Sequence, residues 1–511
     1  MADILTKIVD HRLKDIAEKG IDFGIELPAK RQRLVHSFLQ SKGVILEVKR
    51  ASPSKGDIAP DLDSYKTALS YASCGAGAIS CLTESNYFKG SLKDLMNVCQ
   101  AVDEYEKSVR KPGPAVLRKD FIVSEEEVDI AYRAGADAVL LISRILPEEK
   151  MIAMAKRAAS YGMTSLIEIR LEEDVEKLRA VSKEVESNYL ACGVNSRDLS
   201  DFTIDLLRPS ALMNKIKDVL GKNARVIFES GIRSPQSAAF VSSMGFAGLL
   251  LGEAAAKNPS IRESLVTSFV HQKPDENAVF WTSYSQNTLL KNNKKSLVKI
   301  CGLTNKEDAV FAADSGASFL GFIFYDKSSR KVDSACAEKI LDQVAEKTDA
   351  IRAGVIVDPD DKEACVAIDL CRSGKLDVLQ LHTKNCIEKF LSNPSLRTLP
   401  HYCAVNLSSS EDLSLLDELF DMGECRVLID AFIPGSVGGT GKEIDASLVR
   451  AAAKKYPLWL AGGINPENVS RINTSYCPEL IDLASGVEAS SGIKDKEKIR
   501  QLFEELRTAS L

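Results

Sequence analysis

Short apolar runs alternate with longer amphipathic stretches along the whole of this 511-residue chain. The runs are rich in β-branched residues, as buried strands are, and the stretches between them have helical spacing. This alternation predicts repeated strand-helix units and a parallel sheet. The first half has eight such runs, at 44–50, 77–83, 115–121, 138–143, 165–169, 190–195, 225–231 and 248–254. The second half has eight again, at 297–303, 319–324, 353–358, 378–383, 402–407, 426–431, 458–464 and 480–486.

A polar segment without clean periodicity, residues 273–295, separates the two series of runs. We therefore predict an α/β protein with a domain at 1–272, a linker at 273–295 and a second domain at 296–511. Because one (β/α)₈ barrel takes about 250 residues, two consecutive TIM barrels fit both the number of runs and the length. The first barrel is expected to carry an N-terminal helical extension. A doubly wound fold is the alternative, but the chain has neither G-x-G-x-x-G nor G-x-x-x-x-G-K-[ST].

The first predicted strand carries charge within an apolar run, at Glu47 and Lys49. Side chains alternate along a barrel strand, so Val44, Leu46 and Val48 are expected to face the helices, with Glu47 and Lys49 facing the interior. Active sites of this fold lie at the carboxyl ends of the strands, where interior charges would meet. Polar groups occupy the same place on four further strands, at Lys119, Glu168, Asn195 and Glu229. A rim of mutually satisfied ion pairs is the alternative for any one of them.

Composition and charge narrow the classes of function. With 66 basic and 72 acidic residues well mixed, the net charge of −6 gives no basic stripe for nucleic acid. The first twenty residues lack the apolar core of a signal peptide, and no apolar run approaches the roughly 18 residues of a membrane span. A cytoplasmic enzyme is expected. The twelve cysteines include no C-x-x-C pair and the five histidines lie far apart, so we expect neither a metal nor a disulfide framework.

The first half resembles the indole-3-glycerol-phosphate synthase family. The resemblance rests on "EVKRASPSKG", "LRKDFIV", "LIEI", "GVNSRDL" and "ESGI", in this order on successive predicted strands, and extends to about residue 270. It implies closure of an indole ring, with loss of carbon dioxide and then water. By resemblance Lys119 is the general acid, Lys49 the cation near the substrate carboxylate and Glu168 the general base. The groups that orient and tune them are Glu47, Asn195 and Glu229.

The second half resembles the phosphoribosylanthranilate isomerase family from about residue 297 to the C-terminus. The motifs are "KICGLT", "GFIFYDKSSRKV", "QLH", "LID", "GGTGK", "AGGI", "SGVE" and "GIKD". The implied reaction is an Amadori rearrangement with Asp430 as acid and Cys301 as base, so Asp430 must be protonated and Cys301 a thiolate for part of the cycle. A related barrel isomerase of histidine synthesis uses two aspartates, and Cys301 argues against that assignment. The other eleven cysteines are interpreted as small buried hydrophobes.

The second half departs from its family at two places. Thr383 and Lys384 follow His382 where the family usually has a glycine, and Ala446 replaces a tryptophan often found after the "GGTGK" segment. These departures bear on substrate affinity more than on chemistry.

Both implied substrates carry a phosphate, and strand ends leading into helix N-termini are the usual phosphate site of a barrel. A turn with positive φ is the alternative for any single glycine. Arg197 and Arg330 are expected to help hold the anion. The candidates in the first half are Ser52, Ser230, Gly231 and Gly252. Those in the second half are Gly438, Gly439, Gly462, Gly463, Ser485 and Gly486.

Together the resemblances imply a bifunctional lyase and isomerase of tryptophan biosynthesis, in which the C-terminal barrel acts first. We expect phosphorylated small-molecule substrates, no metal or organic cofactor, no nucleic-acid or membrane partner, a monomer and free diffusion of the intermediate. The alternative is that one barrel is active and the other is a structural module.

Overall fold

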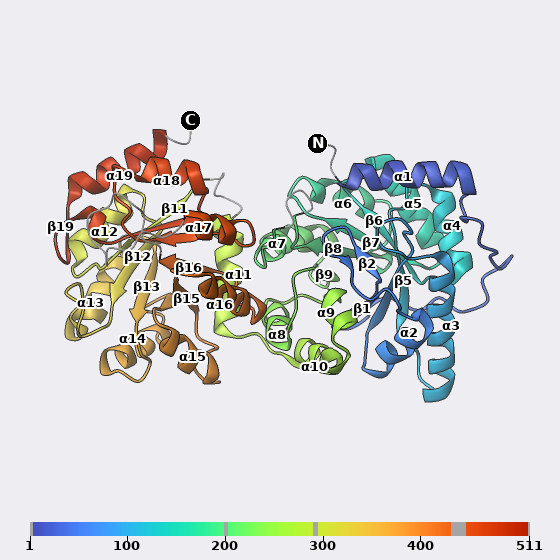
Figure 1. Ribbon diagram of the computed structural model, residues 1–511, viewed down its shortest axis with the longest axis horizontal. Coiled ribbons are helices and arrows are strands. Elements are labelled where there is room, and N and C mark those ends of the chain that lie inside the picture. Colours follow the sequence, from blue (N-terminus) through green and yellow to red (C-terminus); the bar gives the residue numbers. More distant parts are fainter. Residues whose placement is uncertain (1–3, 199–202, 290–294, 431–445, 509–511) are drawn as a thin grey trace. The chain divides into compact units, whose positions relative to one another are not determined.

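The computed structural model describes residues 4–198, 203–289, 295–430 and 446–508. The chain divides into two compact units, Met1–Pro274 and Asp275–Leu511. Each unit contains a closed barrel of eight parallel strands with helices between them (Figure 1). This confirms the predicted fold class, and each of the sixteen apolar runs overlaps one barrel strand.

The first barrel closes through parallel pairing of its first strand with both its last strand and the next strand in the chain. Its strands are β1 (Gly43–Val48), β4 (Ala78–Leu82), β5 (Ala115–Lys119), β6 (Ala138–Ile142), β7 (Thr164–Ile169), β8 (Leu190–Asn195), β9 (Val226–Glu229) and β10 (Gly248–Leu251). Its helices are α1 (Ile4–Lys19), α2 (Ser64–Ser73), α3 (Leu92–Val109), α4 (Glu125–Ala134), α5 (Glu148–Ser160), α6 (Asp174–Ser182), α7 (Arg208–Leu220), α8 (Pro235–Ser243), α9 (Glu253–Lys257) and α10 (Arg262–His271). A small hairpin, β2 (Ala51–Ser52) and β3 (Gly56–Asp57), follows β1.

The interior of the first barrel is apolar below its mouth. The inward residues form one buried cluster, among them Ile45, Leu117, Leu166, Ile227 and Leu250. Since Ile45 belongs to this cluster, Glu47, two residues further along β1, points to the same side, as the alternation predicted. Leu5 and Ile8 of α1 join the cluster, so the predicted N-terminal helix packs onto the barrel.

A buried ion-pair network fixes α1 to the strand that carries Lys119. Arg12 is 4% exposed, and its guanidinium donates to Asp120 at 2.6 Å and, through Nε, to Glu127 at 2.8 Å. Asp120 directly follows Lys119 at the end of β5. The N-terminal helix is therefore positioned by the same strand end that carries a candidate catalytic residue.

The second barrel closes in the same way, with its first and last strands paired. Its strands are β11 (Leu297–Cys301), β12 (Phe319–Ile323), β13 (Ile351–Ile356), β14 (Val378–Leu381), β15 (His401–Asn406), β16 (Val427–Asp430), β17 (Trp459–Ala461) and β18 (Leu480–Leu483). Its helices are α11 (Glu276–Tyr284), α12 (Lys306–Ser315), α13 (Ser334–Ala345), α14 (Lys362–Arg372), α15 (Lys384–Ser392), α16 (Ser410–Asp421), α17 (Ala446–Ala453), α18 (Val469–Tyr476) and α19 (Lys496–Thr508). A hairpin of β19 (Glu488–Ser490) and β20 (Ile493–Lys494) lies between β18 and α19.

The segment expected to be a linker contains a helix that belongs to the second unit. Trp281 of α11 is 1% exposed, and its ring lies 5.9 Å from the ring of Trp459, the first residue of β17. Its indole N–H donates to the carbonyl of His401, the first residue of β15, at 3.2 Å. Helix α11 therefore closes the N-terminal end of this barrel with aromatic side chains. The boundaries 1–272, 273–295 and 296–511 remain predictions.

Trp281→Ala is expected to lower the free energy of unfolding of the second barrel by about 3–5 kcal/mol, the usual cost of truncating a buried aromatic side chain. Denaturant unfolding of the full chain, followed at two wavelengths to separate the two units, measures this change. Val279→Ala is the matched control, because Val279 lies on the same helix and is 60% exposed. Its effect should stay within about 0.5 kcal/mol. Equal, small effects of both changes would contradict a closing role for α11.

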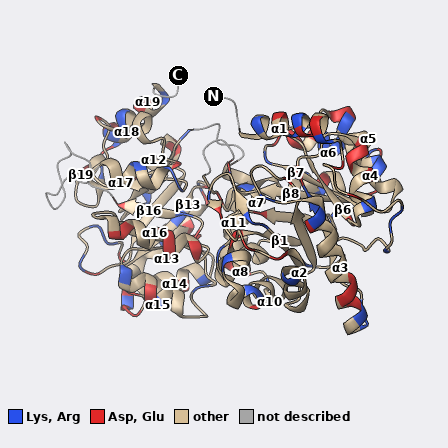
Figure 2. Ribbon diagram, turned by 45° about the vertical axis from the view of Figure 1, so that its right-hand side comes forward, with Lys and Arg blue, Asp and Glu red and all other residues tan. Residues whose placement is uncertain are grey.

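Charged residues concentrate on the helices and loops, with both signs interleaved (Figure 2). The exceptions are buried charges that pair with one another, such as Lys299 with Asp482 at 2.6 Å. Among the described residues, no helix combines the length and the apolar character needed to cross a bilayer.

Candidate active sites

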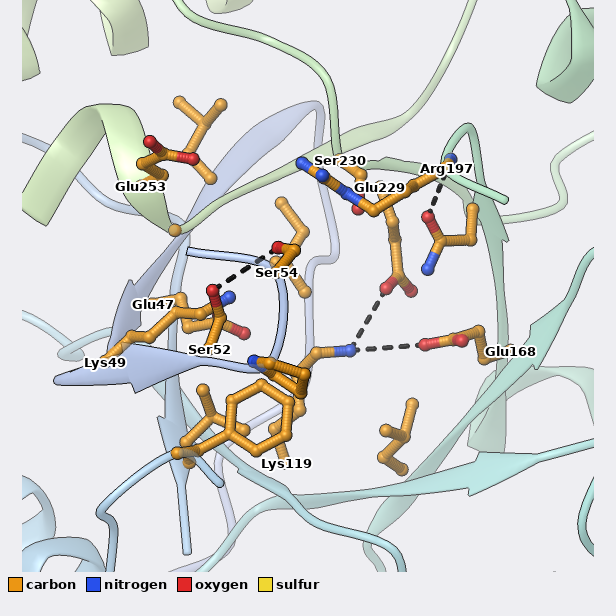
Figure 3. A pocket seen from close by; sticks show the side chains of 18 of the residues that line it. Glu47, Lys49, Ser52, Ser54, Lys119, Glu168, Arg197, Glu229, Ser230 and Glu253 are labelled. Carbon is orange, nitrogen blue, oxygen red and sulfur yellow. Dashed lines mark hydrogen bonds and ion pairs between the residues drawn. The ribbon is translucent and has the colours of Figure 1, made fainter. Parts of the chain in front are cut away.

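A cavity of about 1220 Å³, including its open mouth, lies at the carboxyl ends of the strands of the first barrel. Apolar side chains of α1 and of the barrel form part of its wall, among them Ile8, Phe88 and Leu140. Figure 3 shows polar side chains from several strands converging on this space. All six polar groups predicted for this site line it: Glu47, Lys49, Lys119, Glu168, Asn195 and Glu229.

Lys119 is held between two carboxyl groups. Its ammonium donates to Glu229 Oε2 at 3.1 Å and to Glu168 Oε2 at 3.3 Å (Figure 3). Burial lowers the pKa of Lys119, but the neighbouring carboxyl groups of Glu229 and Glu168 together outweigh burial, and the pKa is raised above its ordinary value. Lys119 therefore carries its proton at neutral pH.

Glu229 is buried at 2% exposure, deeper than Glu168, the other carboxyl that contacts Lys119. Burial raises the pKa of Glu229 to about 8, and the negative charge of Glu168 adds to this effect, although Lys119 opposes both. The protonated form of Glu229 also suits its surroundings, because its Oε1 is buried without a hydrogen-bond partner in the described part of the chain. Glu168 supplies the second carboxyl oxygen within hydrogen-bond distance of the Lys119 ammonium. Gly193 on β8 makes room, since a Cβ there would lie 1.9 Å from Glu229 Oε1.

The raised pKa of Glu229 predicts a pH dependence of stability. Unfolding returns this carboxyl to its ordinary value of about 4.5, so between that pH and about 8 the folded state binds the extra proton. Stability of the first unit should therefore fall as pH rises through this window. In Glu229→Gln, which cannot ionise, this part of the fall should be absent. Thermal unfolding of both proteins at about pH 6 and about pH 9 tests it, and parallel losses would contradict the assignment.

Lys49 and Glu47 form a second charged pair in the same cavity. Lys49 Nζ lies 3.2 Å from Glu47 Oε1 and 5.5 Å from the centre of the Phe88 ring. The Glu47 carboxyl and the aromatic face of Phe88 together fix the position of the Lys49 side chain. Gly252 allows this arrangement, because a Cβ at that position would come within 2.5 Å of Glu47 Oε1.

The residues predicted to bind phosphate in the first barrel also lie together. Asn195 Oδ1 accepts a hydrogen bond from the backbone N–H of Arg197 at 3.0 Å, which links that loop to the end of β8. Arg233, which the sequence reasoning missed, lines the same cavity and directly follows the "ESGI" motif. The predicted phosphate-binding residues that line the cavity are Ser52, Arg197, Ser230, Gly231 and Gly252.

In the second barrel, Cys301 and Asp430 occupy corresponding places at the ends of β11 and β16. Their neighbours Ile300 and Ile429 belong to the outer core between strands and helices, so both candidate residues face the barrel interior. Cys301 is 7% exposed, whereas Asp430 is half-buried.

Burial changes the pKa of both groups in the same direction. It raises the pKa of Asp430, with a further increase from Asp482 and opposition from His382. A protonated Asp430 is what an acid requires. Burial also raises the pKa of the Cys301 thiol, against the opposing charge of Lys299. The thiol is therefore the resting form, and the thiolate expected from the sequence forms at higher pH or only transiently.

The predicted phosphate-binding residues of the second barrel are only partly described. Gly438 and Gly439 lie outside the described residues. Gly462, Gly463, Ser485 and Gly486 follow β17 and β18, where the strand ends should form a phosphate site. Gly486 packs tightly, because a Cβ there would lie 1.9 Å from the carbonyl oxygen of Ile464.

Arg330 is engaged with a carboxylate in this structure. Its Nε donates to both oxygens of Glu488, at 2.9 and 3.0 Å. The same carboxylate accepts from Lys494 at 3.0 Å. An anion bound by Arg330 must therefore share the guanidinium with Glu488.

The structure explains the departure from the family pattern at one of the two places. The Thr383 side chain accepts from the N–H of Cys386 and caps α15, so it replaces the usual glycine with a helix N-cap. Lys384 is the exposed first residue of that helix. Ala446 begins α17, and nothing in the described structure explains the replacement there.

The sequence reasoning passed over a polar group in the interior of the second barrel. Lys299, Gln380 and Asp482 interrupt apolar strands in the same way as the charges of the first barrel. The sequence feature that could have identified this group is a lone polar residue at an inward position of an apolar strand. Lys299, for example, lies two residues before the end of its strand.

Comparison with known proteins agrees with the two-barrel arrangement. The family "Indole-3-glycerol phosphate synthase" matches residues 5–267, and the family "N-(5'phosphoribosyl)anthranilate (PRA) isomerase" matches residues 298–505. The chain is 31% identical to the multifunctional tryptophan biosynthesis protein of Schizosaccharomyces pombe, over 97% of its own length and 65% of that relative. It thus spans about two thirds of that protein.

A shorter relative matches nearly from end to end. The chain is 32% identical to the tryptophan biosynthesis protein TrpCF of Vibrio parahaemolyticus, over 99% of the chain and 95% of the relative. The crystal structure of phosphoribosyl anthranilate isomerase from Thermotoga maritima is 33% identical, with a TM-score of 0.35, over 42% of the chain and 99% of that protein. The chain therefore belongs to the TrpCF family of tryptophan biosynthesis proteins, with its indole-3-glycerol phosphate synthase domain before its PRA isomerase domain.

Proposed function

We propose that the chain catalyses two consecutive steps of tryptophan biosynthesis. The second barrel isomerises N-(5-phosphoribosyl)anthranilate to the carboxyphenylamino-deoxyribulose phosphate, and the first barrel converts that ketone to indole-3-glycerol phosphate. The observation that carries the proposal is the Lys119 ammonium, held between Glu168 and Glu229 in the mouth of a barrel. A buried proton donor flanked by carboxyls suits acid–base chemistry on a carbonyl.

In the isomerase reaction, Asp430 donates its proton to the ring oxygen of the aminoribose as the ring opens. The thiolate of Cys301 then removes the proton from C2′, and the resulting enol becomes the ketone. The raised pKa of Asp430 supports the first role, because it favours the protonated carboxyl that an acid requires. The inward position of Cys301 at the end of β11 supports the second.

In the synthase reaction, the anthranilate ring carbon attacks the ketone carbon, and a carbon–carbon bond forms. Lys119 donates its proton to the carbonyl oxygen, which becomes a hydroxyl. Lys49 holds the substrate carboxylate, which then leaves as carbon dioxide. Finally the hydroxyl leaves as water, with Lys49 contributing, while Glu168 takes the proton released on aromatisation.

The remaining polar groups orient these residues and the substrate. Glu47 fixes Lys49, and Glu229 fixes Lys119 at hydrogen-bond distance. Asn195 positions the loop that carries Arg197. The substrate phosphate is placed against Ser52, Ser230, Gly231, Gly252 and Arg197 in the first barrel. In the second it is placed against Gly438, Gly439, Gly462, Gly463, Ser485 and Gly486, with Arg330 nearby.

We also propose a cytoplasmic monomer that takes phosphorylated small molecules, without nucleic-acid or membrane partners. The proposed proton transfers and the decarboxylation are all assigned to side chains of the chain itself, so no metal or organic cofactor is invoked. Each barrel mouth is expected to exchange with solvent, so the intermediate should diffuse freely. Sedimentation of the purified chain tests the oligomeric state.

The decisive test of the bifunctional assignment is to assay the purified chain separately with each substrate. Both conversions are expected, the first followed by the change in anthranilate fluorescence and the second by formation of indole-glycerol phosphate. If only one conversion occurs, the other barrel is a structural module. If neither occurs in a folded protein, the proposed function is wrong.

A further inference from the structure

A buried lysine lies beneath the proposed base of the second barrel. Lys299 is two residues before Cys301 on β11, so both side chains point to the same, inward side. Lys299 is fully buried, whereas Cys301 lies nearer the mouth at 7% exposure. The proposed reaction assigns no proton transfer to Lys299.

Two acceptors fix the position of the Lys299 ammonium. It donates to Asp482 Oδ2 at 2.6 Å and to Gln380 Oε1 at 2.7 Å. The Tyr402 hydroxyl donates to the same Gln380 oxygen at 2.9 Å, which fixes the orientation of the amide. Replacing a buried ion pair by apolar residues is often neutral for stability, so stability alone does not explain this network.

Gly321 brings the lysine and the cysteine together. It lies opposite Cys301 in the register of β11 and β12. A Cβ at this position would stand 2.7 Å from Cys301 Sγ and 3.0 Å from Lys299 Cε. Both side chains therefore pack against the backbone of Gly321, and the aliphatic part of Lys299 lies next to the thiol.

We propose that Lys299 is a positioning residue whose fixed ammonium stabilises the thiolate of Cys301, with Asp482 and Gln380 holding the ammonium in place. This rests on the proposed function, in which Cys301 is the base. The charged groups that act on Cys301 are Lys299 on its own strand, Asp482 on β18 and Lys494 on β20. Lys299 opposes the rise in the pKa of the thiol more than any other group.

The charge of Lys299 determines where the thiol proton of Cys301 goes. Burial lowers the pKa of Lys299, but Asp482 and Cys301 raise it well above its ordinary value, so Lys299 is already charged and cannot take the thiol proton. In the deprotonated fraction of the protein, that proton has left to water before the substrate enters. The thiolate then accepts the C2′ proton of the substrate, and Lys299 remains an ammonium throughout.

Alkylation of Cys301 by iodoacetamide tests the proposal without an activity assay. The thiolate displaces iodide and forms a carbon–sulfur bond, so the rate follows the thiolate fraction. The rate is measured across pH by mass spectrometry of the peptide that contains Cys301. In Lys299→Met, the midpoint is expected to move to higher pH by about one to three pH units, the usual effect of a nearby opposite charge. Cys336 is exposed, against the expectation that it is a buried hydrophobe, so it serves as the internal reference, and its midpoint should not move.

A second variant controls for misfolding, because Lys299→Met leaves Asp482 buried without its counter-charge. The double change Lys299→Met with Asp482→Asn removes both charges, and the Cys301 midpoint should still rise. An unchanged midpoint in a folded variant would show that the pair is structural only and would overturn the proposal. Failure of the proposed function is distinguishable, because full isomerase activity in Cys301→Ser would reject the base while leaving the alkylation result unaffected.

Discussion

Lys119→Met is expected to reduce the turnover of indole-glycerol-phosphate formation by at least about a hundredfold, the lower end of what a positioned general acid contributes. Methionine nearly matches the length of lysine but has no proton to donate. The substrate should still bind, because the phosphate and carboxylate contacts assigned to other residues remain, so the loss should appear in kcat more than in KM. The assay supplies the ketone substrate directly and follows product formation.

Four controls separate a loss of catalysis from a loss of charge or of folding. Lys119→Arg keeps the charge but holds its proton too tightly, so it should not restore the rate. Lys156→Met is the matched surface control, because Lys156 pairs with Glu184 at an exposed site, and turnover should be unchanged. Circular dichroism monitors folding, and isomerase activity of the same protein should persist. Turnover like that of the wild type in folded Lys119→Met would instead favour the rim ion pair.

The barrel strands could be predicted because each is a short apolar run bounded by a change of periodicity. Inward and outward positions were also predictable for β1, where Glu47 follows the interior residue Ile45 by two positions. The convergence of the six polar groups followed from topology, since parallel strands of a closed barrel bring their carboxyl ends to one mouth. The strands and the facing of their side chains follow from the local pattern of apolar residues, and the convergence follows from the topology of a closed parallel barrel.

Helix α11 could not be predicted in the same way. Its apolar residues form one short stretch between polar flanks, and the two that matter, Trp281 and Tyr284, pack on Trp459, a residue far away in sequence. A helix with a narrow buried face of aromatic residues has weak apolar periodicity, and its packing partner decides its place. Composition therefore suggested a linker where the structure has a closing helix.

The electrostatics of the second site depended on atoms that sequence spacing does not locate. The motif around Cys301 identified the thiol, but not that Asp482 and Gln380 converge on Lys299 at hydrogen-bond distance. It also did not show that burial raises the pKa of Cys301 in the resting protein. In the first barrel, the spacing gave both glutamates, yet only their relative depth distinguishes Glu229 as the one that keeps a proton.

Cys301→Ser is expected to reduce isomerase turnover by about 10²–10⁴, the full contribution of a positioned base. A serine hydroxyl in the same place is a far weaker acid than a thiol, so the oxyanion needed to remove the C2′ proton is essentially absent near neutral pH. The change is nearly isosteric and lies at an inward position, so the barrel should remain folded. Formation of the ketone from phosphoribosylanthranilate measures the effect.

The pH dependence distinguishes a lost base from a disturbed site. Because the pKa of the Cys301 thiol is raised, wild-type isomerase turnover should increase with pH as the thiolate forms. Cys301→Ser should lose this rise along with the rate, whereas Cys336→Ser, at an exposed cysteine, should keep both. Synthase activity should be the same in all three proteins. If Cys301→Ser retained most of the isomerase turnover with a wild-type pH profile, another group would have to remove the C2′ proton.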